Sequence, residues 1–426
     1  MRIAIIGTGI AGNVAAHALH RDHELTVYEA ADHVGGHTHT HRIELEGEVQ
    51  QIDTGFIVYN HRTYPQFTRL LGELGVASKE SSMSFSVRDE RSDLEYNGTS
   101  LNRLFAQRRN LVRPSFLRMV RDIVRFNREA PTLLDAAAGE TTLGDYLVEQ
   151  RYGAHFVDDY LVPMGAAIWS TDPQRMLAFP ARFFVRFLHN HGMLTLNDRP
   201  LWRVVAGGSA RYVERLVAPW RHRIRLNCAV TQVRRLADGV LVGAQGAPTE
   251  RYDHVFLACH ADQALRLLAD PSPAEREILG ALPFQGNEAV LHTDTSLLPR
   301  RRLAWAAWNS HVLPQHDQRV ALTYNMNILQ GLCSRHTFCV TLNRSDAIDP
   351  RRVLKRLTYH HPLFTPEGVA AQGRHHEISG VRRTHYCGAY WRFGFHEDGV
   401  ASALQAVQRF EQGLHHHAQR ALQRVA

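Results

Sequence analysis

The chain has 426 residues, of which 44% are apolar and 21% are charged, so it can bury a sizeable core and is not disordered throughout. Its formal net charge of +7 comes almost entirely from arginine, because Lys79 and Lys355 are the only lysines. Five scattered cysteines argue against a disulfide framework and favour a reducing, cytoplasmic compartment, and the lack of an apolar run of about 18 residues excludes a membrane-spanning helix.

The first segment predicts a strand, a glycine turn and a helix. Residues Arg2–Ile6 are β-branched and apolar, and Gly7, Gly9 and Gly12 follow at once, before apolar residues at helical spacing. Gly7 permits a tight turn, Gly9 lets the backbone approach a pyrophosphate, and Gly12 lets the helix pack on the strand. The helix N-terminus then offers free N–H groups to phosphates. This arrangement indicates a dinucleotide-binding α/β unit.

A second strand is predicted at Leu25–Tyr28, and Glu29 ends it, 22 residues after Gly7. An acidic residue at this distance can accept hydrogen bonds from ribose hydroxyls. The doublet Gly35–Gly36 follows, and His37 comes next. This series resembles the flavin amine oxidase, phytoene desaturase and protoporphyrinogen oxidase superfamily, in which a doublet flanked by arginines wraps the FAD diphosphate. In this chain His33 and His37 stand at the arginine positions.

The resemblance implies FAD rather than NAD, and a Rossmann-like (GR2-type) FAD-binding domain with an inserted α+β substrate domain. It places Gly388 and the residues Glu397 and Asp398, before the last helical pattern, close to the flavin. We expect both acids to cap backbone N–H groups there. Val230 would lie near the adenine through its backbone. We expect Ile224–Val233, Val240–Val242 and Tyr252–Cys259 to be strands and Asp238–Gly239 a hairpin turn.

The expected FAD-binding domain is discontinuous, with residues 1–60, 201–284 and 381–426. The substrate domain would contain residues 61–200, which are largely helical by spacing, and 285–380. In the second insertion we predict strands at Ala289–His292, Val320–Asn325 and Phe338–Leu342, and helices near Asp349–Leu357.

Four motifs resemble a bacterial subgroup of amine-oxidase-like flavoproteins that is associated with fatty-acyl modification; they are Asp53–Asn60, Pro163–Ser170, His189–Gly192 and Gly394–Gly399. The resemblance implies an FAD-dependent oxidoreductase that oxidises or desaturates a fatty-acyl or polyene substrate by hydride transfer. The catalytic residues stay unknown; aromatic candidates for the flavin face are Trp169, Tyr390, Trp391 and Phe395. No second glycine motif follows a strand, so oxygen, a quinone or a carrier protein would accept the electrons.

Two alternatives stay open. Amine oxidases of the superfamily often place a lysine, through water, beside flavin N5, on the strand that corresponds to Phe284–His292. That stretch has no lysine here, which weakens the amine oxidase hypothesis. The alternative from another class is a non-oxidative flavin isomerase, or a binding protein that FAD merely stabilises.

The histidines and arginines bear on three other possible partners: a metal, a nucleic acid and a membrane. The 27 histidines form clusters such as His37/His39/His41 and His360/His361 without the spacing of a metal motif, so we predict no metal. The arginines are dispersed and match no nucleic-acid-binding module. In Ser115–Arg128 the residues Arg118, Arg121, Arg125 and Arg128 share one helical stripe, which predicts peripheral contact with the inner face of a membrane.

Overall fold

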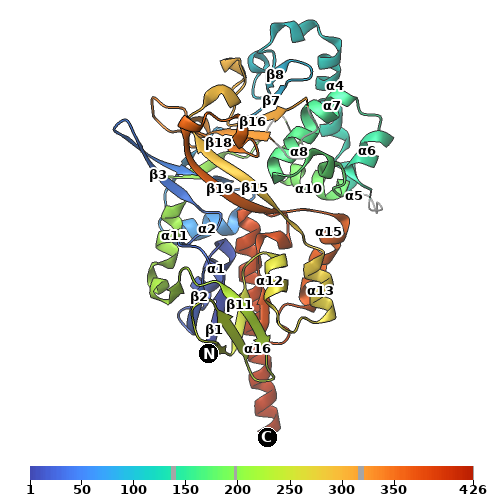
Figure 1. The fold of residues 1–426 in the computed structure, drawn as a ribbon. Helices are drawn as coiled ribbons and strands as arrows, with labels where there is room; N and C mark the ends of the chain where they lie inside the picture. The colour runs from blue at the N-terminus through green and yellow to red at the C-terminus, as the bar shows by residue number, and fades with distance from the viewer. Residues whose placement is uncertain (136–140, 196–198, 315–320, 426) are drawn as a thin grey trace.

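The structure is a computed structural model that describes residues 1–135, 141–195, 199–314 and 321–425, with the backbone alone for 416–425. Figure 1 shows two lobes: both termini and residues 210–280 lie in the lower lobe, and residues 85–190 and 308–342 lie mainly in the upper one. Helix α16 (His396–Val425) runs down through the lower lobe.

A five-stranded sheet in the order β10-β2-β1-β14-β20 forms the centre of the lower lobe, and all its neighbouring strands are parallel. Its strands are β1 (Arg2–Ile6), β2 (Glu24–Tyr28), β10 (Ile224–Arg225), β14 (His254–Leu257) and β20 (Thr384–Tyr386). The strands are short and almost fully buried, as a parallel sheet covered on both faces requires. The first two strands are confirmed at their expected places.

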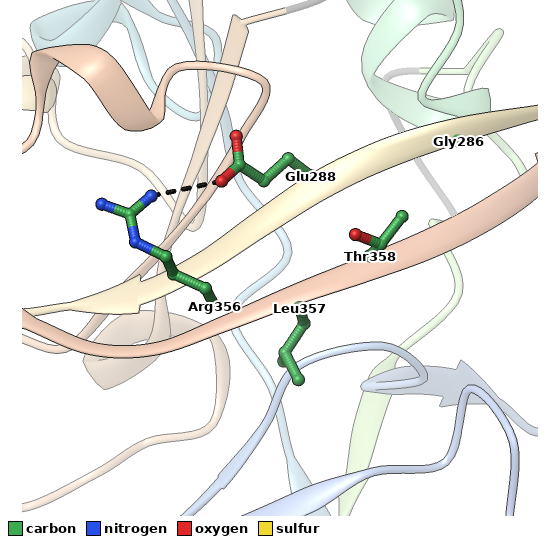
Figure 2. A pocket seen from close by; sticks show the side chains of 5 residues that line it. All are labelled: Gly286, Glu288, Arg356, Leu357 and Thr358. Atoms are coloured by element: carbon green, nitrogen blue, oxygen red, sulfur yellow. Dashed lines mark hydrogen bonds and ion pairs between the residues drawn. The ribbon is translucent and has the colours of Figure 1, made fainter. Parts of the chain in front are cut away.

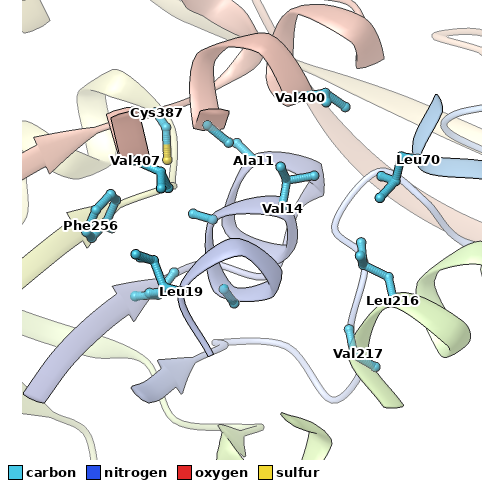
Figure 3. Close-up of a cluster of buried hydrophobic side chains, with 14 of the residues drawn as sticks. Ala11, Val14, Leu19, Leu70, Leu216, Val217, Phe256, Cys387, Val400 and Val407 are labelled. Carbon is cyan, nitrogen blue, oxygen red and sulfur yellow. The ribbon is translucent and has the colours of Figure 1, made fainter. Parts of the chain in front are cut away.

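One face of this sheet is covered by α1 (Ile10–Leu19) and α16, with α2 (Pro65–Glu73) and α11 (Ala210–Val217) beside them. Figure 3 shows the apolar cluster that joins them, in which Val14 of α1, Leu216 of α11 and Val407 of α16 converge. The other face packs on a sheet of β11 (Val230–Arg235), β12 (Val240–Ala244) and β13 (Glu250–Tyr252), and on α12 (Ala261–Leu267) and α13 (Pro273–Gly280). Because both faces of the sheet are covered, the ends of β1 and β2 are held in place.

Two expected strands are each divided in the structure. The stretch Ile224–Val233 contains β10, then a break at Asn227, whose φ of 51° ends the strand, and then β11 in another sheet. Likewise β13 ends at Tyr252 and β14 begins at His254. The two halves of each stretch pair with different partners, which the apolar pattern alone does not reveal. The predicted hairpin turn at Asp238–Gly239 is confirmed between β11 and β12.

A seven-stranded sheet in the order β19-β15-β18-β17-β16-β7-β8 forms the centre of the upper lobe. Its neighbours are antiparallel except β16 and β7. The strands are β7 (Phe85–Asp89), β8 (Leu94–Asn97), β15 (Phe284–His292), β16 (Trp308–Val312), β17 (Ala321–Asn325), β18 (Cys339–Leu342) and β19 (Val353–Pro362).

The prediction of helices near Asp349–Leu357 is wrong. Only Pro350–Arg352 is helical, as a single 3-10 turn, and β19 follows at once and pairs with β15 along its length. From Arg356 to His361 the exposed residues alternate with more buried ones, so pairing with β15 decides the structure rather than local helix propensity.

Short helices cover this sheet, which confirms the expected helical character of residues 61–200 where they are described. They are α3 (Leu101–Leu104), α4 (Pro114–Glu129), α5 (Thr132–Asp135), α6 (Leu143–Glu149), α7 (Ala154–Phe156), α8 (Val162–Trp169), α9 (Pro173–Leu177) and α10 (Ala181–Asn190). Many of their buried residues are aromatic. Two later short helices are α14 (Met326–Leu329) and α15 (Pro366–Gly373).

Two small sheets complete the fold. The hairpin of β3 (Thr40–Leu45) and β4 (Glu48–Asp53) projects from one side, and β5 (Val58–Asn60) and β6 (Ser78–Glu80) both pair with β9 (Trp202–Val205). In the part of the chain that the structure describes, no helix has the length and apolar character that crossing a membrane requires.

Candidate functional site

The turn between β1 and α1 is tightly packed at two glycines and open at the third. A Cβ on Gly7, whose φ is +102°, would lie 2.8 Å from the carbonyl oxygen of Ala258, and one on Gly12 would lie 1.9 Å from that of Gly7. A Cβ on Gly9 would meet nothing within 4 Å. The free space therefore lies at the N-terminus of α1, where unpaired N–H groups favour an anion.

Glu29 lies beside this turn. Its carboxylate accepts hydrogen bonds from the backbone N–H groups of Thr8 and Ala31, each at 2.9 Å, and from the Thr8 hydroxyl. The side chain is half-buried at the end of β2. The acid thus occupies the place that the sequence spacing predicts.

The second glycine loop packs directly on the first one. Gly35 donates its N–H to the carbonyl of Thr8 at 3.1 Å, and a Cβ on Gly36 would lie 3.1 Å from the Cα of Gly9. The next residue, His37, has a buried Nε2 without a hydrogen-bond partner among the described residues. Burial lowers the pKa of His37 to about 4, so the imidazole is neutral near pH 7. It offers a hydrogen bond there instead of the permanent charge of an arginine.

The N-terminus of α16 reaches the same place. A Cβ on Gly399 would lie 2.5 Å from Cγ2 of Ile10, so the first turns of α1 and α16 meet. Gly388 donates its N–H to the hydroxyl of Ser402 at 3.1 Å, which holds the preceding loop on this helix. Two helix N-termini and two glycine loops therefore converge.

The two acids of α16 cap different helices. Asp398 accepts a hydrogen bond from the N–H of Phe395 at 2.9 Å, within its own first turn. Glu397 accepts from the N–H groups of Gln66 and Phe67, at 3.0 and 2.9 Å, at the start of α2. Burial raises the pKa of Asp398 to about 7 and also raises that of Glu397. Their capping role agrees with the expectation from sequence, but Glu397 serves a neighbouring helix.

The aromatic candidates lie in two different places. Trp169 donates its indole N–H to the carbonyl of Phe393 at 3.1 Å, and its ring centroid lies 6.4 Å from that of Phe395, within the aromatic cluster of the upper lobe. Tyr390 and Trp391 instead belong to the apolar core of the lower lobe, where Trp391 lies 4.2 Å from the His375 ring. The four side chains therefore do not form one wall. Val230 begins β11 and pairs with Ala244.

One partly buried polar network, on β15 and β19, was not predicted from the sequence. Asn343 donates its amide to Oδ1 of Asn287 at 2.8 Å, and Asn287 donates to Nδ1 of His361 at 3.0 Å. The His361 ring lies 5.4 Å from the His37 ring, and burial lowers its pKa to about 3. In the sequence, only the paired histidines His360/His361 pointed to this network. Its members come together because β15 pairs with β19.

The opposite face of the same two strands carries a separate pocket of about 370 Å³, lined by Gly286, Glu288, Arg356, Leu357 and Thr358. Figure 2 shows Glu288 and Arg356 paired there, at 3.2 Å. Because side chains alternate along a strand, Glu288 and Asn287 point to opposite faces. Among the described residues, no three or more side chains are grouped so that they could hold a metal ion.

A family model described as flavin-containing amine oxidoreductase matches residues 10–304. The chain belongs to the flavin-containing amine oxidoreductase family. This membership confirms the expected superfamily, the FAD-dependent oxidoreductase activity and the Rossmann-like fold with a substrate domain.

Solved structures resemble this amine oxidoreductase over nearly its whole length. Cyclohexylamine oxidase from Brevibacterium oxydans has a TM-score of 0.72 at 16% identity, with 97% of this chain and 99% of that chain covered. A CLA-producing fatty acid isomerase from P. acnes has a TM-score of 0.68 at 16% identity, with 96% and 98% covered. At such identities the likeness shows the fold alone.

One curated relative matches over a short segment. The flavin-dependent L-tryptophan oxidase RebO from Lentzea aerocolonigenes is 38% identical over 81 residues, which are 18% of this chain and 16% of the oxidase. The amine oxidoreductase described here thus aligns with a small part of that relative's length.

The residues present fit an FAD. The open space beside Gly9 and the meeting of two helix N-termini suit a diphosphate, and the Glu29 carboxylate lies beside the same turn. The unpartnered Nε2 of His37 is a further polar atom at the second loop.

Proposed function

We propose that this FAD-dependent oxidoreductase oxidises or desaturates a hydrophobic fatty-acyl or polyene chain at a carbon–carbon position. When bound, the flavin supplies the hydride acceptor. The protein's part is to bind and orient the chain, exclude water and hold polar groups in fixed protonation states.

One observation carries the proposal. Strand β15 corresponds to the strand on which amine oxidases of the superfamily often place their lysine. In this chain β15 carries Asn287, which is hydrogen-bonded to the neutral His361. Because Nδ1 of His361 accepts from the amide of Asn287, the proton of the neutral ring is on Nε2. This gives an uncharged N–H donor, suited to the polar end of an acyl chain.

The surroundings support an apolar substrate. The ring of Phe395 lies 4.8 Å from that of Phe187 and 5.8 Å from that of His191, and Trp169 belongs to the same cluster. Burial lowers the pKa of His191 to about 4, so this ring is neutral as well. Apolar and neutral side chains of this kind favour contact with hydrocarbon over contact with a cation.

The buried acids nearby are already occupied. Asp53 accepts hydrogen bonds from Ser209 and from the Gln330 amide, while Glu397 and Asp398 cap helices. Burial raises the pKa of Asp53 to about 6. These groups therefore support the fold and do not offer a free carboxylate to a protonated amine.

Amine oxidation is the second candidate, because the similar structures include cyclohexylamine oxidase and a putrescine oxidase bound to putrescine, with a TM-score of 0.69 for the latter. A redox-neutral isomerisation is the third, because a fatty acid isomerase is similar as well. Enzymes of both kinds share this fold, so only the reaction products distinguish these candidates from the proposed function.

Product analysis separates the three. The purified enzyme is incubated with unsaturated fatty acid, phospholipid, benzylamine or a polyamine, and the products are measured by mass spectrometry. The proposal predicts loss of two hydrogens from the acyl chain, with reoxidation of the flavin by oxygen or a quinone. Aldehyde and ammonia from the amines would establish amine oxidation, and an acyl product of unchanged mass would establish isomerisation; either result would contradict the proposal.

A further inference from the structure

The far end of the upper lobe has an unusual charge distribution. Between Glu95 and Asp122 the chain has no acidic residue but six arginines, which are Arg103, Arg108, Arg109, Arg113, Arg118 and Arg121. They lie on α3, on the 3-10 turn Arg108–Val112 and on the first half of α4, except Arg113, which joins the turn to α4. The turn contacts α4, and α3 contacts the adjoining strand β8.

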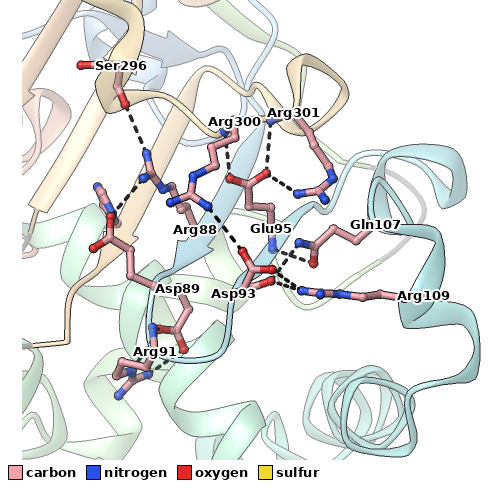
Figure 4. A network of polar contacts seen from close by, with 12 residues as sticks. Arg88, Asp89, Arg91, Asp93, Glu95, Gln107, Arg109, Ser296, Arg300 and Arg301 are labelled. Carbon is pink, nitrogen blue, oxygen red and sulfur yellow. Dashed lines mark hydrogen bonds and ion pairs between the residues drawn. The ribbon is translucent and has the colours of Figure 1, made fainter.

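Most of these arginines have no acidic partner. Arg109 pairs with Asp93 at 2.7 Å, and at the same flank Glu95 pairs with Arg301 at 3.2 Å, as Figure 4 shows. By contrast, Arg103, Arg108, Arg113 and Arg118 form no ion pair with an acid in the part of the chain that the structure describes. Their charge is therefore available to an anionic partner.

Aliphatic side chains project between these charges. Leu101 is 76% exposed, Leu111 52%, Val112 81%, Leu117 43% and Val124 54%. Single exposed aliphatic residues are ordinary, but five within 24 residues, beside unpaired arginines, are an amphipathic surface.

The exposed stripe of α4 differs from the one that the sequence predicts. Phe116, Met119 and Phe126 are buried against the lobe, and Arg125 is held over the Tyr152 ring at 3.9 Å. The outward stripe follows the spacing of four, three and four residues, with Leu117, Arg121, Val124 and Arg128 in turn. It continues at its N-terminal end into Leu111 and Val112.

We propose that this surface, made of Leu101, Leu111, Val112, Leu117 and Val124 with the surrounding arginines, docks the protein on an anionic lipid surface. The arginines bind headgroup phosphates, and the aliphatic tips enter the interface between headgroups and acyl chains. The inference does not rest on the proposed substrate, because it concerns only the outer face of the lobe.

Vesicle co-sedimentation tests it. The full chain loaded with FAD is mixed with one of two kinds of vesicle. The first is phosphatidylcholine alone, and the second contains about 30% phosphatidylglycerol, which makes it strongly anionic. We expect binding to the anionic vesicles only, weakening as salt rises. Val112→Glu should weaken binding about tenfold or more, because it removes an inserted side chain and adds a repelled charge. Arg118→Gln should weaken it about fivefold at low salt, and less at high salt.

Val49→Glu is the matched control. Val49 is 45% exposed on the β3–β4 hairpin, on another side of the molecule, and the change alters the net charge equally. It should leave binding unchanged, and retained flavin absorbance reports that each variant is folded. Equal binding by Val112→Glu and Val49→Glu would overturn the proposal, as would the absence of binding at low salt. Binding of a single-stranded RNA that both Val112→Glu and Arg118→Gln weaken, without binding to vesicles, would assign the surface to nucleic acid instead.

Discussion

Asn287 and His361 are 74 residues apart, and the amide of Asn287 donates a hydrogen bond to the Nδ1 atom of His361 at 3.0 Å. The Asn287 oxygen accepts from Asn343, so the orientation of its amide is fixed. A neutral imidazole with its proton on Nε2 is thereby held beside His37, at the boundary between the two lobes. The proposed reaction depends on this pair.

Replacing His361 by leucine should lower kcat/KM about tenfold or more, because it removes the held N–H donor. His360→Leu is the control, since its ring points to the other face of β19, over Gly286. Steady-state kinetics should place the loss in kcat/KM for the acyl substrate, and FAD content should stay equal in both variants. Equal activity of the two would argue against a role for His361.

Glu29→Ala should weaken FAD binding about tenfold, through the loss of a charged acceptor. Asp32→Ala removes an exposed acid three residues away and should change nothing. Fluorescence titration of the apoprotein with FAD measures both affinities. An unchanged affinity in Glu29→Ala would mean that the ribose does not lie where the sequence motif places it.

Asp398 makes stability depend on pH. Its folded pKa, raised to about 7 by burial, lies above the ordinary value, so the folded state binds the proton more tightly than the unfolded state does. This contribution is full below about pH 4, and it is lost as pH rises through 7, at about 1.4 kcal/mol per pH unit at most. Asp53 acts in the same direction up to about pH 6.

In Asp398→Asn the melting temperature should therefore fall less steeply as pH rises from 5 to 8, which is roughly the window set by the shifted pKa of Asp398. It should also lower FAD retention more than turnover per bound flavin, because the cap of α16 is altered. Thermal scans across pH, with and without FAD, provide the check. An unchanged slope would show that another group is responsible.

Glu397→Gln should loosen the start of α2. The loss of a charged acceptor to two backbone N–H groups costs about 1 kcal/mol. Hydrogen exchange at Gln66 and Phe67 should become about fivefold faster. Glu73→Gln, which removes only the exposed pair with Arg69 on the same helix, serves as the control and should leave these amides unchanged.

The sequence alone was sufficient for the first unit of the fold. The strand Arg2–Ile6, the glycine turn and the position of Glu29 follow from neighbouring residues, whose geometry is set locally. The order of Gly7, Gly9 and Gly12 in the motif also predicts that the first and third are tightly packed and the second is open.

Long-range pairing accounts for what the sequence did not predict. Residues Val353–Leu357 form a strand because β15 is available to pair with them, and Glu397 caps a helix 330 residues away. The Asn287–His361 contact likewise exists only once two strands have paired. Local pattern carries no information about such partners.

Anaerobic reduction of the flavin tests the central claim most directly. The loaded enzyme is mixed without oxygen with an unsaturated fatty acid or phospholipid and, separately, with benzylamine or a polyamine, and the flavin absorbance is followed. The account predicts bleaching by the acyl compound, little or none by the amines, and recovery of the colour when an electron acceptor is admitted. Bleaching by the amines while the acyl compounds leave the flavin oxidised would contradict it.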